Sequence, residues 1–229
     1  MSSGLFVVFE GGDGVGKSTQ VQLLVERLRD AGVEVVRTFE PGDSLAGKEI
    51  RRIVLSPETG DLDPRAEALL YAADKAQHLY EVVRPALGRG AVVVCDRYVD
   101  SMLAYQGAGR VLDVDEVEQM ARWATADLRP DLTVLLDTDP YQSVQTKINK
   151  DRLEGAGAEF HERVRAGFQR LAQSDPGHYL VLDARRTIEE IAEAVWTVVQ
   201  NRLDGGTGGG ESVGGGAVGG GGETGAHDN

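Results

Sequence analysis

The 229-residue sequence predicts an α/β fold in which a mostly parallel sheet is covered by helices on both faces. Short apolar runs alternate along the chain with longer stretches of helical period, which is typical of this class. Most of the runs lack charged residues, as expected for strands that are buried on both faces. A glycine-rich turn also joins the first run to the first helical stretch. These observations predict one layered domain with alternating strands and helices.

Five apolar runs are predicted as strands, and only the second carries charges, Glu34 and Arg37. The predicted strands are 5–9, 33–38, 91–95, 132–136 and 179–182. Helical periodicity predicts helices at 17–31, 64–87, 113–127, 158–173 and 187–202. The pair Asp63-Pro64 supports the start of the second helix, because aspartate caps helices and proline suits their first turn.

The composition changes near residue 204. Of the 30 glycines, 13 lie at 205–229, where no apolar periodicity remains. We therefore expect a domain at 1–204 and a disordered tail at 205–229. A passive extension is favoured for this tail over a tethering or partner-binding segment, because its composition supplies no recognition element.

Charge and apolar content exclude several classes of protein. Lysine and arginine number 24 against 37 acidic residues, so a net charge of −13 disfavours binding to nucleic acid or to an anionic membrane surface. No apolar run approaches the roughly 20 residues needed to span a bilayer. The single cysteine, Cys95, suits a reducing compartment, and its place on an apolar run favours a packed core thiol. We expect a cytoplasmic location.

Residues 11–18, GGDGVGKS, match the pattern Gly-x-x-x-x-Gly-Lys-Ser/Thr at every position. In such a P-loop the backbone N–H groups surround phosphate oxygens, and the helix that follows adds its positive end. Lys17 would reach the β- and γ-phosphates, and the Ser18 hydroxyl would bind Mg²⁺. The predicted fold is therefore the three-layer fold of P-loop proteins. The expected ATP-binding residues are Gly11, Gly12, Asp13, Gly14, Val15, Gly16, Lys17, Ser18 and Thr19.

Asp96 ends the third predicted strand, where a carboxylate can support the magnesium ion. The alternative is a cap for the helix that follows. A GTPase would need Asn-Lys-x-Asp after a strand, but the aspartate of Asn149-Lys150-Asp151 comes one place early. Motor ATPases generally have larger domains or basic surfaces, so a kinase for a nucleotide or metabolite is favoured.

Further strings occur in a fixed order after the P-loop. They are Glu40-Pro41-Gly42, LYAADKAQH at 70–78, Asp96-Arg97-Tyr98, AYQGAGR at 104–110 and DRLE at 151–154. In this order and spacing the chain resembles bacterial thymidylate kinases from about residue 5 to residue 202. The resemblance implies transfer of the γ-phosphoryl group of ATP to dTMP, giving dTDP and ADP. It also implies a five-stranded parallel sheet, a mobile lid at about 142–156 and a homodimer.

The resemblance also implies the dTMP-binding residues, which are Asp13, Phe39, Tyr71, Lys75, Arg97, Tyr105 and Gln106. An acceptor phosphate carries about two charges, so it needs a cation such as Arg97 nearby. Tyr71 occupies the position that stacks on thymine, and Lys75 follows one helical turn later. The alternatives are a surface ion pair for Arg97 and core packing for Tyr71.

Tyr105 and Gln106 correspond to the segment that closes over the nucleoside, although the glycines after them also fit a turn that ends a helix. Asp13 matches an acidic position near the sugar and the acceptor phosphate. An obligatory base is not assigned to it, because phosphoryl transfer relies mainly on positioning and charge stabilisation.

Four positions depart from the family pattern. Phe39 stands where many relatives have arginine, and Arg37 is a candidate to replace that cation. Lys75 replaces an arginine and loses its bidentate fork. Met102 stands where a small polar residue is common, and the lid lacks an arginine-rich run. We expect Arg152, assisted by Lys147 or Lys150, to stabilise the transferring phosphoryl group, although these residues also fit a solvated helix connection.

The sequence as a whole predicts an ATP- and Mg²⁺-dependent dTMP kinase. Its expected catalytic residues are Lys17, Arg97, Arg152 and Asp13, and its expected metal-binding residues are Ser18 and Asp96. Two alternatives stay open. The first is a kinase for another deoxynucleoside monophosphate, which the changes at Phe39, Lys75 and Met102 permit. The second is a nucleotide-binding module without activity, in which the tail recruits a partner.

Overall fold

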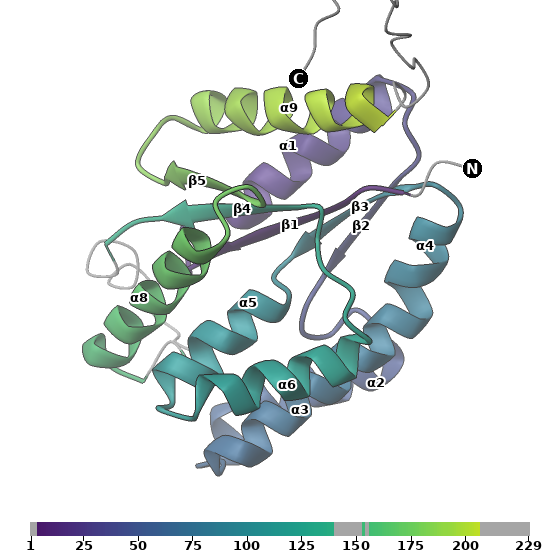
Figure 1. Ribbon diagram of the computed structural model, residues 1–229. Helices are drawn as coiled ribbons and strands as arrows, with labels where there is room; N and C mark the ends of the chain where they lie inside the picture. Colours follow the sequence, from purple (N-terminus) through teal and green to yellow (C-terminus); the bar gives the residue numbers. More distant parts are fainter. Residues whose placement is uncertain (1–3, 140–152, 154–155, 207–229) are drawn as a thin grey trace, which may run out of the picture.

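A computed structural model describes residues 4–139, 153 and 156–206. Its centre is a sheet of five strands in the order β2-β3-β1-β4-β5, and every neighbouring pair is parallel (Figure 1). The strands are β1 (Phe6–Gly11), β2 (Val35–Phe39), β3 (Val92–Asp96), β4 (Leu132–Asp137) and β5 (Tyr179–Asp183). The predicted fold class is confirmed.

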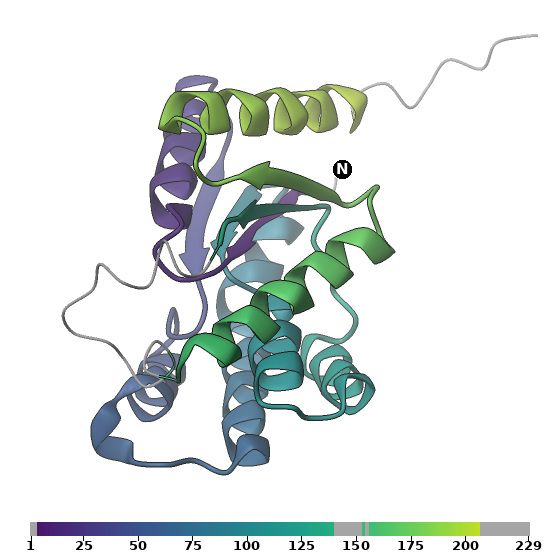
Figure 2. The ribbon, with the colours of Figure 1, turned by 90° about the vertical axis from the view of Figure 1, so that its left-hand side faces the viewer.

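Helices cover both faces of this sheet. Helices α1 (Lys17–Asp30) and α9 (Ile188–Gly206) cover one face, and most of the others lie on the opposite side (Figures 1 and 2). The others are α2 (Leu45–Leu55), η1 (Pro57–Thr59), α3 (Pro64–His78), η2 (Leu79–Val83), α4 (Arg84–Gly88), α5 (Val99–Met102), η3 (Leu103–Gly109), α6 (Val114–Thr125) and α8 (Ala158–Ser174). Among the residues described, no helix is both long and apolar enough to cross a membrane.

The two faces of β1 show how the layers are held together. Phe6 and Val8 pack into the core on the side of α3, α6 and α8, whereas Val7 and Phe9 pack against α1 and α9. All four side chains are at most 1% exposed. A parallel strand covered on both faces has no polar side, which is why this run lacks an alternating pattern.

The helix predicted at 64–87 is present as a continuous helical segment that contains one irregular turn. It consists of α3 to His78, the π-helical turn η2 and then α4. Proline removes a backbone donor and its ring collides with the preceding turn of an α-helix. Pro85 lies in the first turn of α4, and the wider π-helical turn before it accommodates the ring.

Two helical segments near the site have no counterpart among the predicted helices. Helix α2 follows Ser44, whose hydroxyl accepts a hydrogen bond from the Gly47 N–H at 2.9 Å. Its signals are this cap and the spacing of Ala46, Ile50 and Val54. The second segment is α5 with η3, which follows β3 directly. Helix α9 also continues to Gly206, four residues past its predicted end, and the proposed tail beyond 206 lies outside the described residues.

The layered core predicts a clear difference between two leucines. Leu28 in α1 is fully buried, whereas Leu45 in α2 is 80% exposed. Leu28→Ala should lower the free energy of unfolding by about 3 kcal/mol, because it removes apolar contacts and leaves a cavity. Leu45→Ala should change it by less than about 0.5 kcal/mol. Urea unfolding measures both, and equal effects would contradict this account of the core.

Candidate active site

The P-loop turns sharply between β1 and α1. Gly11 has φ +133°, and a Cβ atom there would lie 2.4 Å from the Leu136 carbonyl oxygen, so a larger residue does not fit. Gly16 caps α1 in the left-handed conformation with φ 94°. Residues with a side chain rarely adopt these backbone angles, which explains why both positions are glycine. The loop therefore ends at the N-terminus of a long helix, where backbone N–H groups and the helix dipole favour anions.

Lys17 lies in the first turn of α1, and its side chain is folded back onto the loop. The ammonium group donates to the carbonyl oxygens of Gly11 at 3.1 Å and of Gly12 at 2.6 Å. Burial lowers the pKa of Lys17 to about 8. Because burial disfavours the charged form, an anion placed against this group would restore its proton.

Ser18 and Asp96 meet across two elements. The Ser18 hydroxyl donates to Asp96 Oδ2 at 2.9 Å, which brings the start of α1 to the end of β3. The side chain of Asp96 does not cap α5. The contact with Ser18 therefore favours a metal-supporting role for Asp96 over the alternative of a helix cap. Both groups offer the hard oxygen ligands that Mg²⁺ prefers. Within the described residues no cluster of three or more histidine, cysteine or acidic side chains could hold a metal. If Mg²⁺ is held at Ser18 and Asp96, most of its oxygen ligands must come from phosphate and water.

An open cavity lies beside the P-loop. Helices α2 and α3 form one wall, and α5 with η3 forms another. The lining residues are Asp13, Glu40, Pro41, Arg51, Leu55, Tyr71, Lys75, Arg97, Ser101, Met102, Tyr105, Gln106 and Leu153. The lining combines an aromatic ring with several charged groups, the kinds of side chain that orient a small ligand.

Arg97 connects the P-loop with this cavity. Its guanidinium donates to Asp13 Oδ1 at 2.6 Å and to the Gly11 carbonyl oxygen at 3.0 Å. It also contacts Ser101 at 3.0 Å and the Tyr105 hydroxyl at 3.3 Å. Asp13 accepts a further hydrogen bond from the Tyr105 hydroxyl at 2.8 Å. Arg97 thus forms an ion pair, as the alternative from the sequence has it. The pair with Asp13 lies in the cavity wall, however, and not on the open surface.

The backbone of Arg97 has φ 72°, a conformation that is strained for a residue with a side chain. Glu10, fully buried in β1, holds the chain that follows. Its carboxylate accepts from the N–H groups of Tyr98 at 2.8 Å and Ser101 at 3.1 Å, and from the Ser101 hydroxyl at 2.6 Å. Glu10 therefore caps α5 from a distant strand. Burial and the nearby charge of Asp100 raise the pKa of Glu10 to about 7. The charge of Arg97 and the hydrogen bonds from Ser101 and Tyr98 lower it, but they do not outweigh this effect.

The sequence reasoning missed Glu10. A carboxylate that directly follows an apolar strand, next to the P-loop, was the available signal.

Helix α3 presents Tyr71 and Lys75 to the cavity, one turn apart, as predicted. The Lys75 ammonium donates to Glu40 Oε2 at 2.5 Å, and Glu40 Oε1 contacts His78 Nδ1 at 2.8 Å. Burial raises the pKa of Glu40, but Lys75 and His78 outweigh it and hold the pKa below its ordinary value. Burial lowers the pKa of Lys75, and the Glu40 charge more than compensates. Lys75 thus reaches the cavity with its charge already paired.

Tyr105 and Gln106 both lie in η3 and line the cavity, and η3 then ends at Gly109, within the glycine-containing segment. Gln106 Nε2 donates to Glu67 Oε1 at 2.9 Å. The ring of Tyr105 meets Phe160 edge-on, with centroids 6.0 Å apart. Both residues are therefore held in place by contacts behind the cavity wall.

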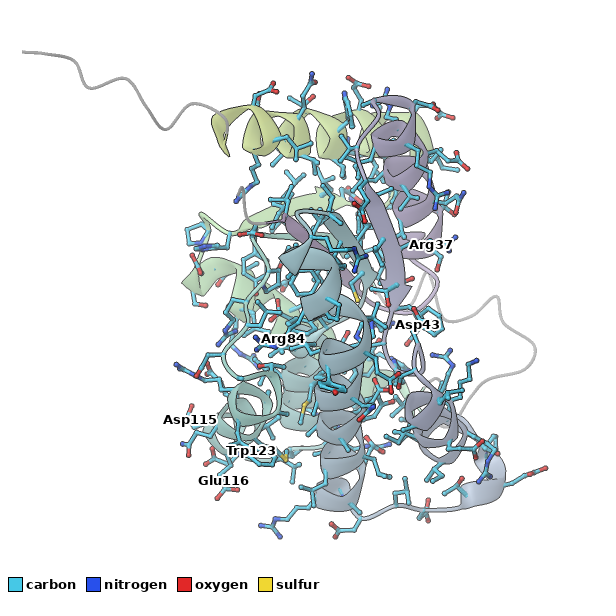
Figure 3. All side chains as sticks on the ribbon, turned by 90° about the vertical axis from the view of Figure 1, so that its right-hand side faces the viewer. Arg37, Asp43, Arg84, Asp115, Glu116 and Trp123 are labelled. Carbon is cyan, nitrogen blue, oxygen red and sulfur yellow. The ribbon has the colours of Figure 1, made fainter. Side chains whose placement is uncertain are left out.

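Phe39 and Arg37 do not line the cavity. Arg37 is exposed on β2 and donates to Gln22 in α1, so it does not replace the cation missing at Phe39 (Figure 3). Arg51 of α2 lines the cavity instead, with its guanidinium 5.7 Å from the centre of the Phe39 ring. It donates to the Pro41 carbonyl oxygen at 2.7 Å. The sequence reasoning missed Arg51 because it missed α2.

Several predicted residues take other positions. Thr19 is exposed on α1, while Val15 is buried against the core on that side of the sheet. Met102 is buried and lines the cavity without offering a polar group to it. Arg152, Lys147 and Lys150 lie outside the described residues, as does most of the lid. From the lid range, Leu153 is described and lines the cavity.

Comparison with known proteins identifies the family. A sequence model of thymidylate kinase matches residues 9–195. The chain belongs to the thymidylate kinase family. A thymidylate kinase of Cutibacterium acnes is 60% identical over 192 residues, which cover 84% of this chain and 94% of the relative. One of Clavibacter michiganensis subsp. michiganensis is 55% identical over 210 residues, 89% of this chain and 98% of the relative.

A solved structure of thymidylate kinase from Ehrlichia chaffeensis superposes with a TM-score of 0.73 at 32% identity. The match covers 86% of this chain and 99% of that structure. The predicted family, fold and phosphorylation of dTMP by ATP are confirmed by these matches. The P-loop and the neighbouring cavity are therefore the candidate active site of this thymidylate kinase family member.

The lowered pKa of Lys17 predicts that ATP binding takes up protons in alkaline solution. With a pKa of about 8, Lys17 of the free protein is largely neutral at pH 9. A bound triphosphate raises that pKa, so binding at pH 9 should take up about one proton, and at pH 7 about a tenth of one. Calorimetry in buffers of different ionisation enthalpy measures this uptake.

Lys17→Arg is the matched control, because a guanidinium stays charged at both pH values. Its binding should show no uptake at pH 9. Equal uptake in the two proteins would assign the proton to another group and contradict this account of Lys17.

Proposed function

We propose that this chain transfers the γ-phosphoryl group of ATP from the P-loop to a dTMP molecule held in the adjoining cavity. The observation that supports this assignment most directly is the cavity itself. It opens beside the P-loop and combines an aromatic ring, Tyr71, with two guanidinium groups, Arg51 and Arg97. A nucleoside monophosphate offers a flat base and a dianionic phosphate, which match these two kinds of side chain.

On the donor side, Lys17 would exchange the carbonyl oxygens of Gly11 and Gly12 for phosphate oxygens. Ser18 can donate its proton to Asp96 and still present lone pairs to a metal, as the 2.9 Å contact allows. Mg²⁺, the cofactor we propose, would supply positive charge that offsets the negative charge of the phosphates. Asp96 would keep the Ser18 hydroxyl oriented toward that ion.

On the acceptor side, Arg51 and Arg97 would hold the phosphate. Both terminal nitrogens of Arg97 already contact protein acceptors, so a phosphate would meet its Nε–H or replace one of these acceptors. Arg51 makes one such hydrogen bond, to Pro41, and keeps further N–H groups for a ligand. Tyr71 would stack on the base, and Phe39 would act through Arg51, whose guanidinium it supports.

Catalysis would rest on positioning and on charge. The acceptor phosphate attacks as an anion, so no strong base is required. Asp13 accepts from both Arg97 and Tyr105, and these contacts suit a residue that orients the acceptor site. Lys17 would stabilise the charge that develops on the transferred group. Arg152 stays our candidate for a second cation from the lid.

Arg51 and its neighbour Arg52 provide the test of the acceptor site. Arg51→Met should raise the KM for dTMP at least tenfold, because it removes a charge from the phosphate, with a smaller effect on the KM for ATP. Arg52 is exposed and pairs with Glu49 at 3.2 Å, away from the cavity lining, so Arg52→Met should leave both values within twofold. Steady-state kinetics with ATP, Mg²⁺ and dTMP measures both variants. Unchanged KM for dTMP in Arg51→Met would refute the proposed phosphate position.

We also propose a homodimer that pairs through α3 and α6. These helices pack against each other, and they expose large apolar side chains, Leu69 at 59% and Trp123 at 84%. Trp123 is labelled in Figure 3. An interface over these helices would bury both side chains, and apolar patches that are covered in this way are typical of interaction surfaces. The proposed cytoplasmic location stays a prediction.

Trp123→Glu should convert the dimer to a monomer, since it places a charge in the proposed contact. Ile188 is also exposed but begins α9 on the opposite face of the sheet, so Ile188→Glu should leave the dimer intact. Sedimentation equilibrium distinguishes the two states. A wild-type monomer, or a dimer that survives Trp123→Glu, would contradict the proposed interface.

A further inference from the structure

One face of α3 carries three polar residues at steps of four, Glu67, Tyr71 and Lys75. Tyr71 and Lys75 line the cavity, whereas Glu67 lies behind Gln106 and is fully buried. None of the roles proposed above uses Glu67. A buried carboxylate is costly unless it is paired and hydrogen-bonded, so its partners show what it does.

Arg110, directly after η3, supplies the charge that pairs with Glu67. Its Nε lies 3.2 Å from Glu67 Oε1, and a terminal nitrogen lies 3.1 Å from Oε2. The guanidinium also lies over the Phe160 ring, 5.0 Å from its centre. Two nitrogens of a permanently charged guanidinium favour the ionised form of the carboxylate, and an ionised carboxylate can only accept hydrogen bonds.

This acceptor decides which way the amide of Gln106 faces. Only the NH₂ end can donate to Glu67, and Nε2 lies 2.9 Å from Glu67 Oε1. The amide oxygen is the other arm of the same planar group. Among the residues described, no protein donor is recorded for that oxygen, and Gln106 lines the cavity. The oxygen is therefore the arm left for a ligand.

We propose that Glu67, held by Arg110, fixes the amide of Gln106 so that its oxygen faces the base of the acceptor nucleotide and selects a pyrimidine with a ring N3–H. Thymine and uracil carry that N–H next to the O4 acceptor. Cytosine presents the reverse pattern, with an unprotonated N3 and an amino group. Lys75, which also lines the cavity, can only donate, so it suits O4 and opposes an amino group. Glu67 is thus a positioning residue for base specificity.

The inference rests on the proposed placement of the thymine ring in this cavity, and Glu67→Gln tests it separately. The new amide can donate as well as accept, so Gln106 becomes free to turn over and offer its NH₂ group to cytosine. The ratio of kcat/KM for dTMP to that for dCMP should fall at least tenfold, since a polar group that is fixed in a pocket strongly rejects a mismatched partner. The ratio for dTMP to dUMP should stay within twofold, because both bases carry N3–H.

Two further variants separate specificity from general damage. In a Gln106→Leu background, Glu67→Gln should no longer change the dTMP-to-dCMP ratio, because there is no amide to orient. Glu116→Gln, the same exchange at an exposed position of α6, should leave all ratios unchanged (Figure 3). If Glu67→Gln does not fold, Arg110→Met provides the same test, since it removes the charge that keeps Glu67 an acceptor.

Three outcomes would overturn the inference. They are an unchanged dTMP-to-dCMP ratio in Glu67→Gln, a fall of equal size in the Gln106→Leu background, and a parallel loss of the dTMP-to-dUMP ratio. In each case the wild-type protein would still phosphorylate dTMP, so the proposed function would stand. Failure of the function itself would instead appear as wild-type protein without activity toward dTMP.

Discussion

The ion pair between Arg97 and Asp13 is the contact on which the rest of the site depends. Asp13 follows β1 and Arg97 follows β3, and these neighbouring parallel strands end at the same edge of the sheet. Their 2.6 Å contact joins the P-loop to the wall of the acceptor cavity. Arg97 makes this contact with a strained backbone conformation. Such strain costs about 1–3 kcal/mol, so surrounding contacts must stabilise it. Glu10 provides that support from inside the sheet.

The protein has a net charge of −13, yet the cavity is lined by three cations, Arg51, Lys75 and Arg97. Lys75 is paired with Glu40, and Arg97 is paired with Asp13. These carboxylates keep Lys75 and Arg97 charged and in place, but they also neutralise part of the positive charge that each residue can present to an anionic ligand. Arg51 contacts a neutral carbonyl oxygen and therefore brings the larger share of uncompensated charge. Under the proposed function, Arg51 would supply the positive charge that the family pattern places at the position of Phe39.

The features that sequence alone predicted are those encoded in short segments. The P-loop, Asp96 and the face of α3 with Tyr71 and Lys75 depend on spacing within one strand, turn or helix. Glu10 and Glu67 were missed because their partners lie far along the chain: Glu10 caps a helix that begins about 90 residues later, and Glu67 meets Gln106, 39 residues away. Arg51 was missed with its helix. The π-helical turn before Pro85 shows how a local break can be absorbed within a longer helix.

A crystal structure with dTMP, Mg²⁺ and a non-hydrolysable ATP analogue would test the central claim most directly. We expect the two nucleotides to meet at the edge formed by β1 and β3, with the dTMP phosphate between Arg51 and Arg97 and thymine on the Tyr71 ring. The triphosphate should follow residues 11–18. A monophosphate bound elsewhere, or an Arg97–Asp13 pair that excludes it from the cavity, would contradict the account.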